Sequence, residues 1–76
     1  MITEIILLNN IESVNSFVSK MAKKEYDVDL SHGKYLVNAK SIMGVLSLDL
    51  TQPVTVKADT NDQAFLEEIK EYIAEK

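Results

Sequence analysis

The chain lacks several residue types, and each absence narrows what the protein can do. It has no cysteine, so it offers no disulfide framework and gives no sign of a secreted scaffold. Its longest apolar run, Ile5 to Leu8, is too short to cross a bilayer, and no basic segment followed by an apolar stretch opens the chain. We therefore expect a cytoplasmic protein with no membrane span.

Arginine is missing as well, since all 8 basic residues are lysines, and the formal net charge is −4. Binding to nucleic acid needs a basic face and leans heavily on arginine, so we expect no nucleic-acid partner. The absence of arginine also removes the side chain best suited to hold a phosphate with two parallel hydrogen bonds. At 76 residues, of which 46% are hydrophobic, the chain predicts one folded domain over 1–76.

Hydrophobic periodicity predicts the element order β-α-β-β-α-β-α. Apolar residues at steps of three and four indicate amphipathic helices, whereas strict alternation indicates strands with one buried face. The predicted strands cover 2–8, 26–30, 34–39 and 54–58, and the predicted helices cover 11–22, 42–47 and the segment after 60–63. These elements favour an α+β fold with one four-stranded antiparallel sheet, helices on one face and water on the other.

Local signals define how some of these elements begin. Asn10 and Ser41 each precede an apolar helical pattern and are good N-cap residues. The tetrad 60–63 has the spacing of a capping box, which predicts that Thr60 caps the last helix. The strand at 2–8 is apolar on both faces, which predicts a central or well-covered strand rather than an edge.

Conventional catalytic chemistry has few candidates here. His32 is the only histidine, and it lies in a predicted hairpin turn with a poor set of neighbouring metal ligands, so we interpret it as a solvated turn residue. The acidic side chains of the last helix are interpreted as a solubilising surface, because a solvated helix face does not separate two pKa values. These side chains are Glu67, Glu68, Glu71 and Glu75. We expect no enzyme activity, cofactor or metal.

Ser41 is the more promising residue. As an N-cap, its hydroxyl lies beside unpaired backbone N–H groups, a setting that tolerates a phosphate. The short helix that follows carries more apolar side chains than two turns can direct to one core, so some should be exposed and mark a partner site. These side chains are Ile42, Met43, Val45, Leu46 and Leu48. The alternative is that Ser41 is only a cap and that another segment covers the apolar residues.

The run Asn-Ala-Lys-Ser-Ile-Met-Gly-Val-Leu-Ser-Leu at 38–48 closely resembles the regulatory-serine segment of HPr, the phosphocarrier family of the bacterial sugar phosphotransferase system. The resemblance also covers the element order and implies an open-faced sandwich with three helices on one face of the sheet. It implies that Ser41 matches the serine phosphorylated by HPr kinase. It further implies that Ile42, Met43 and Leu46, together with Lys40, belong to the surface that contacts enzyme I, the kinase and the catabolite control protein.

Two residues depart from the family pattern. Counting back from Ser41 without gaps, Asn10 stands at the position of the phospho-accepting histidine and Glu12 at that of the phosphate-holding arginine. An asparagine amide is not a phosphoryl acceptor, and a carboxylate repels an incoming phosphate. The stretch between Ser47 and the last helix is also shorter than is usual in the family. The sequence is therefore closest in type to the catabolite-repression homologue (Crh), which lacks the active histidine.

Three hypotheses follow from the sequence. The first is a regulatory protein, a monomer or weak dimer, that is phosphorylated on Ser41 by an HPr-kinase-like enzyme and binds a catabolite-control-type regulator or an enzyme I-like partner. The second is a phosphocarrier that uses His32 as its acceptor. The third is a divergent binding domain in which Ser41 only caps a helix.

Overall fold

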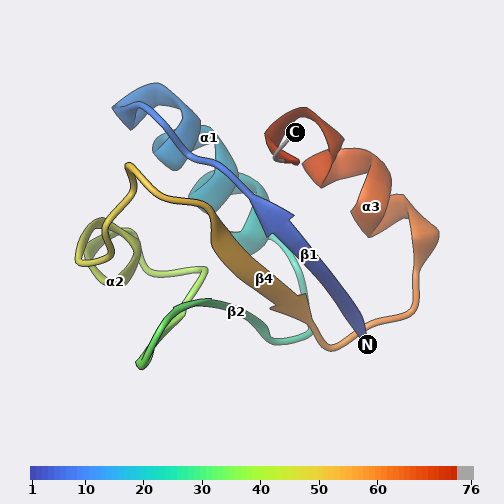
Figure 1. The fold of residues 1–76 in the computed structure, drawn as a ribbon. Coiled ribbons are helices and arrows are strands. Elements are labelled where there is room, and N and C mark those ends of the chain that lie inside the picture. The colour runs from blue at the N-terminus through green and yellow to red at the C-terminus, as the bar shows by residue number, and fades with distance from the viewer. Residues whose placement is uncertain (74–76) are drawn as a thin grey trace.

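The protein is built on a four-stranded antiparallel sheet in the order β1-β4-β2-β3 (Figure 1). The structure, a computed structural model, describes residues 1–73. The strands are β1 (Ile2–Ile6), β2 (Val28–His32), β3 (Tyr35–Asn38) and β4 (Val54–Ala58). Every end of every strand lies within two residues of its predicted position, and both ends of β4 agree with the prediction. The predicted α+β sheet is therefore confirmed.

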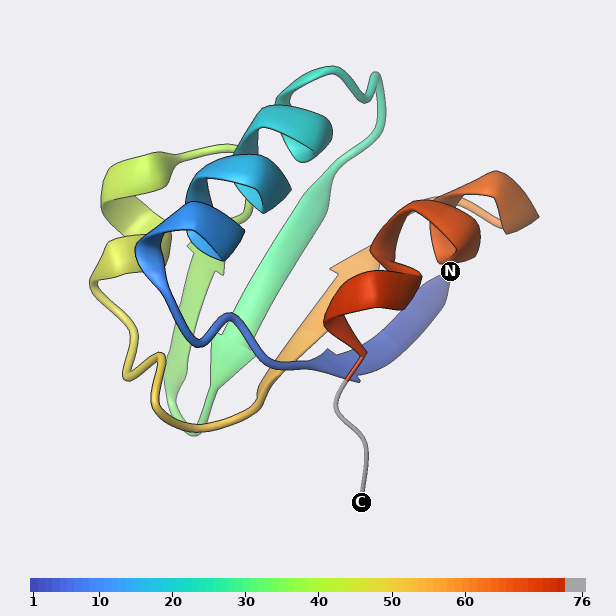
Figure 2. The same ribbon diagram turned by 90° about the horizontal axis from the view of Figure 1, so that it is seen from above.

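Three α-helices lie on one face of this sheet and leave the other face open (Figure 2). They are α1 (Ile11–Ala22), α2 (Ile42–Leu46) and α3 (Gln63–Ile69), and a 3₁₀ turn, η1 (Lys70–Tyr72), extends α3. Asn10 caps α1 as predicted, because its side-chain oxygen accepts a hydrogen bond from the Ser13 amide at 2.8 Å. Within residues 1–73, no helix has the length and apolarity needed to cross a membrane.

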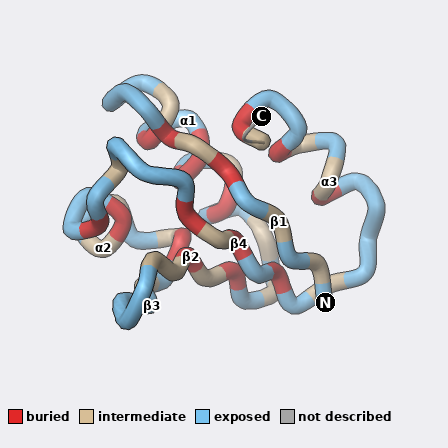
Figure 3. The backbone as a smooth tube through the Cα atoms, in the orientation of Figure 1, coloured by how far each residue is buried: buried red, intermediate tan, exposed pale blue. Residues whose placement is uncertain are grey.

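The hydrophobic core lies between the sheet and the helices, and Figure 3 marks the buried positions along the backbone in red. Its largest fully buried side chains come from every layer, because alternate residues of the strands and one stripe of each long helix face inward. They include Ile6, Leu30 and Val56 from the strands and Phe17, Met21, Phe65 and Ile69 from the helices. The opposite, open face carries the paired residues Asp29 and Lys57, which is consistent with a wet surface.

One prediction about β1 was wrong, because this strand lies at an edge of the sheet. Its residue Ile5 faces the open side and is 54% exposed. The outer edge of β1 is nevertheless partly covered, since Ile6 forms a β-bridge with Ile73 and the Leu7 amide donates to the Tyr72 carbonyl at 2.8 Å. The apolar run thus reflects a strand end enclosed by the chain's own C-terminal segment.

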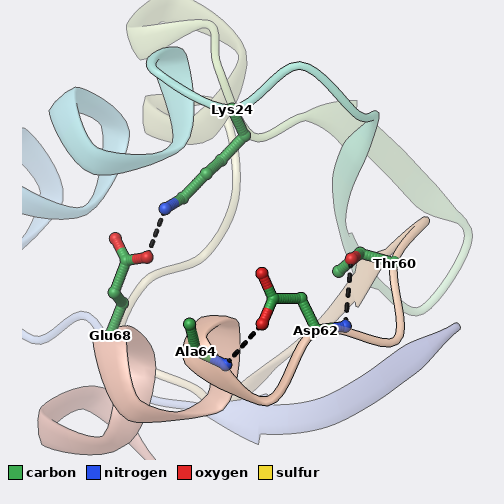
Figure 4. Close-up of polar contacts among 5 residues, drawn as sticks. All are labelled: Lys24, Thr60, Asp62, Ala64 and Glu68. Atoms are coloured by element: carbon green, nitrogen blue, oxygen red, sulfur yellow. Dashed lines mark hydrogen bonds and ion pairs between the residues drawn. The ribbon is translucent and has the colours of Figure 1, made fainter.

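The last helix begins two residues later than its capping-box spacing predicted. Asp62, not Thr60, is the N-cap, and its carboxylate accepts from the Ala64 amide at 2.9 Å (Figure 4). The Thr60 hydroxyl instead accepts from the Asp62 amide at 3.1 Å, so it fixes the turn that leads into the helix. Both side chains thus accept from the amide two residues further on, and the helix begins only after the second of these turns.

The acidic face of α3 is also more than a solvated surface. Glu68 forms an ion pair with Lys24 (Figure 4), and Glu71 of η1 forms one with Lys20. Both pairs join the end of α1 to the last helix, across 44 and 51 residues of sequence. Glu67 is exposed, and Glu75 lies outside the described residues.

Candidate phosphorylation and docking site

Ser41 occupies the turn between β3 and α2, with its side chain exposed. Its hydroxyl oxygen accepts from the Gly44 amide at 3.2 Å, and its carbonyl accepts from the Val45 amide at 3.0 Å. The predicted N-cap is therefore confirmed. A hydroxyl in this position can be reached from solvent and lies next to backbone N–H groups, which suits an added negative charge.

The apolar residues of α2 divide into a buried and an exposed set, as the sequence predicted. Val45, and Leu48 just after the helix, belong to the core, whereas Ile42 is half-buried against it. Met43 is 78% exposed and Leu46 is 43% exposed. The short helix thus presents two large apolar side chains to solvent. No other segment within residues 1–73 covers them.

The start of α1 adds a third exposed apolar side chain, Ile11, which is 57% exposed. Leu46 and Ile11 line a surface groove together with the apolar residues Leu8, Val14 and Leu50. We call this the apolar groove. It joins the beginning of α1 to the end of α2, and Asn10 lies on its wall.

A second hollow, which is polar, shares Asn10 with the apolar groove. It is lined by Asn10, Glu12, Ser13, Ser16, Glu71 and Tyr72, and we call it the acidic hollow. In it the Tyr72 hydroxyl and the Ser16 hydroxyl share a hydrogen bond of 2.7 Å. The Lys20 ammonium lies 5.1 Å from the centre of the Tyr72 ring, and the hydrogen bond to Glu71 raises the pKa of Lys20.

Sequence reasoning missed the acidic hollow. Tyr72 and Ser16 lie 56 positions apart in the sequence, and no local pattern joins them. Asn10 and Glu12, expected from the sequence to depart from the family pattern, are the one signal that points to this surface.

The remaining candidates lie elsewhere. His32 is the last residue of β2, not a loop residue, and it pairs with Tyr35 across the two-residue loop that begins at Gly33. It is not among the residues that line either hollow. The Lys40 ammonium donates to the Lys24 carbonyl at 2.8 Å, so it ties the turn before α2 to the end of α1. Within residues 1–73 no cluster of three or more histidine or acidic side chains could hold a metal ion.

An open-faced sheet with three covering helices and a capping serine ahead of a short apolar helix defines the HPr type of architecture. Comparisons with known proteins agree with it. The family model described as the PTS HPr component phosphorylation site matches residues 13–75. A crystal structure of HPr-C-His from Thermoanaerobacter tengcongensis superposes with a TM-score of 0.72 at 30% sequence identity, covering 92% of this chain and 84% of that one. No curated protein sequence matches.

The chain therefore belongs to the HPr family of the phosphotransferase system. Members of this family are phosphocarriers rather than enzymes, and they interact with other proteins of that system. The matched residues begin at position 13, after Asn10 and Glu12.

Proposed function

We propose that this protein is a regulatory HPr-family protein, of the Crh type, that is phosphorylated on Ser41 and does not carry phosphate on a histidine. Residues 1–76 act as one HPr-like domain in the cytoplasm. The observation that carries the proposal is the exposed Ser41 hydroxyl at the start of α2, next to the exposed side chains of Met43 and Leu46. An HPr-kinase-like enzyme that reaches the serine hydroxyl would also contact the apolar side chains beside it.

The start of α1 supports the loss of phosphotransfer. Asn10 uses its side-chain oxygen to cap α1, so this residue serves the helix rather than a reaction. Glu12 follows in the first turn, where its carboxylate would repel a phosphoryl group brought to Asn10. With no arginine in the chain, no guanidinium can compensate.

The docking surface of the proposal consists of Met43 and Leu46, supported from below by the half-buried Ile42. Lys40 contributes indirectly, because its bond to the Lys24 carbonyl holds the turn that presents Ser41. The partner on this surface would be the kinase, and then a catabolite-control-type regulator or an enzyme I-like protein.

The experiment is to incubate the protein with HPr kinase and ATP and to measure its mass. We expect one added phosphate on the wild-type chain and none on Ser41→Ala. Ser47→Ala is the matched control, because Ser47 is exposed at the other end of the same helix and donates to the Gly44 carbonyl. It should be phosphorylated like the wild type. An unmodified wild-type chain contradicts the proposal.

Enzyme I and phosphoenolpyruvate provide the second arm of the test. We expect no acid-labile phosphate on the chain, since Asn10 cannot accept one. Labelling that is abolished by His32→Ala would instead identify His32 as an alternative acceptor and would overturn the regulatory assignment.

A further inference from the structure

The apolar groove and the acidic hollow adjoin each other at Asn10, which lines both. Each has a volume of about 230 Å³, which is room for one long side chain. A segment of a partner that crosses Asn10 would therefore meet an apolar surface on one side and a carboxylate-bearing surface on the other. The two hollows together make a binding surface with a defined chemical polarity.

The charge of the acidic hollow determines which side chain fits it. Glu12 forms no ion pair with any residue in the described range 1–73, so its carboxylate is available to a partner. The hydroxyl groups of Ser13, Ser16 and Tyr72 can accept further hydrogen bonds. Anionic groups, including phosphates of nucleic acids and lipids, would be repelled by Glu12.

The chain itself shows that an ammonium group fits against these walls. Lys20 donates to Glu71 and lies over the Tyr72 ring at 5.1 Å, so two walls of the hollow already hold a cation from one side. Glu12 lines the same hollow and supplies a second carboxylate, one that has no ion pair within residues 1–73. Because Lys20 already occupies Glu71 and the Tyr72 ring, a cation from a partner would pair with Glu12 and donate to the hydroxyl groups of the lining.

We infer that the double hollow binds a segment of a protein partner that carries an apolar and a cationic side chain, the apolar one entering the apolar groove and the cationic one pairing with Glu12. The inference rests on the proposed function in one respect, that Leu46 belongs to a docking surface, and it extends that surface to the start of α1. It adds the partner's chemistry, which is basic where it meets the start of α1.

The probe for this inference is a short peptide of alternating leucine and lysine, added to the ¹⁵N-labelled protein and followed by amide chemical shifts. A peptide with glutamate in place of each lysine is the matched ligand. We expect the basic peptide to shift amides of Asn10, Glu12 and Leu46, and the acidic peptide to shift none of them. Rising salt should weaken the basic peptide's binding.

Single substitutions then separate the two hollows. Glu12→Gln should weaken binding of the basic peptide about two- to five-fold and reduce its salt dependence, as expected for loss of one exposed ion pair. Leu46→Gln should weaken binding while leaving the salt dependence unchanged. Glu67→Gln removes an exposed carboxylate of α3 outside the hollow and should bind like the wild type.

Three results would overturn the inference: equal binding of the two peptides, shifts confined to the open face of the sheet, or equal affinities of Glu12→Gln and wild type. Each leaves the kinase test of Ser41 intact, because that test measures a mass change without any peptide. Conversely, an unphosphorylated Ser41 with peptide binding at Glu12 would reject only the phosphorylation.

Discussion

Asp49, in the loop after α2, shows how single residues set the local structure beside the apolar groove. Its carboxylate accepts from the Thr51 hydroxyl at 2.6 Å and from the Thr51 amide at 3.1 Å. These two hydrogen bonds lower the pKa of Asp49, and the charge of His32 adds to the effect. Because Thr51 also lines the apolar groove, these two hydrogen bonds hold one part of that groove in place.

Thr51→Val should raise the pKa of Asp49 toward its ordinary value, because the variant loses the hydroxyl donor and keeps the amide. A carboxyl with a lowered pKa stabilises the fold above its ordinary pKa, about pH 4, and loses this contribution as the pH falls through the folded-state pKa. The variant should therefore be less stable than wild type at neutral pH, and the difference should vanish in acid. An NMR titration of the Asp49 carboxyl and unfolding curves across pH measure both effects.

Thr51→Ser keeps the hydroxyl and is the control for this prediction. Its Asp49 pKa should stay low. An equally raised pKa in both variants would mean that the hydroxyl is not the cause.

Among the elements, the sequence predicted those whose signals are local and missed what depends on distant neighbours. The caps at Asn10 and Ser41 were correct because a side chain that satisfies its own helix needs no other part of the chain. The count of apolar side chains on a short helix predicted that some of them are exposed, and Met43 and Leu46 are. The edge position of β1 was missed, because Ile73 and Tyr72 close that edge from the far end of the chain.

Alanine at the two glycines should have opposite effects on stability, because only one of them has a positive φ. Gly33 opens the β2–β3 loop with φ of 61°, and a Cβ added there would meet no atom within 4 Å. Gly33→Ala should lower the free energy of unfolding by about 1–2 kcal/mol, entirely through the strained backbone.

Gly44 has no positive φ, and an added Cβ would lie 3.4 Å from the Val37 Cβ. Gly44→Ala should raise stability by about 0.5–1 kcal/mol, because alanine favours α2.

Urea denaturation of both variants measures the two changes. If Gly44→Ala were destabilising, the contact with Val37 would be too tight and α2 would have to shift on β3. If Gly33→Ala were neutral, the loop would have changed its turn type.

At the scale of the whole molecule, the last helix is fastened to the first by contacts between residues about fifty positions apart. The Phe17 and Tyr72 rings meet edge to face, with centres 5.5 Å apart and planes at 88°. The Tyr72 hydroxyl bonds to Ser16, and Lys20 and Lys24 pair with Glu71 and Glu68 on the same side. The acidic hollow is a consequence of this closure, so a sequence read one element at a time could not reveal it.

Tyr72 belongs both to the core and to the acidic hollow. Its ring is buried, and its hydroxyl bonds to Ser16 in the lining of the hollow. Tyr72→Phe keeps the ring contact with Phe17 and loses the hydrogen bonds of the hydroxyl to Ser16 and to Lys20, and both partners can then bond to water. It should lower the free energy of unfolding by about 0.5–1.5 kcal/mol. Tyr72→Ala also empties the ring's place in the core and should cost about 3–5 kcal/mol. Tyr35→Phe removes the hydroxyl of a tyrosine that is 70% exposed and should leave stability unchanged. Equal losses for Tyr72→Phe and Tyr72→Ala in urea denaturation would show that the hydroxyl, and not the ring, holds α1 and the last helix together.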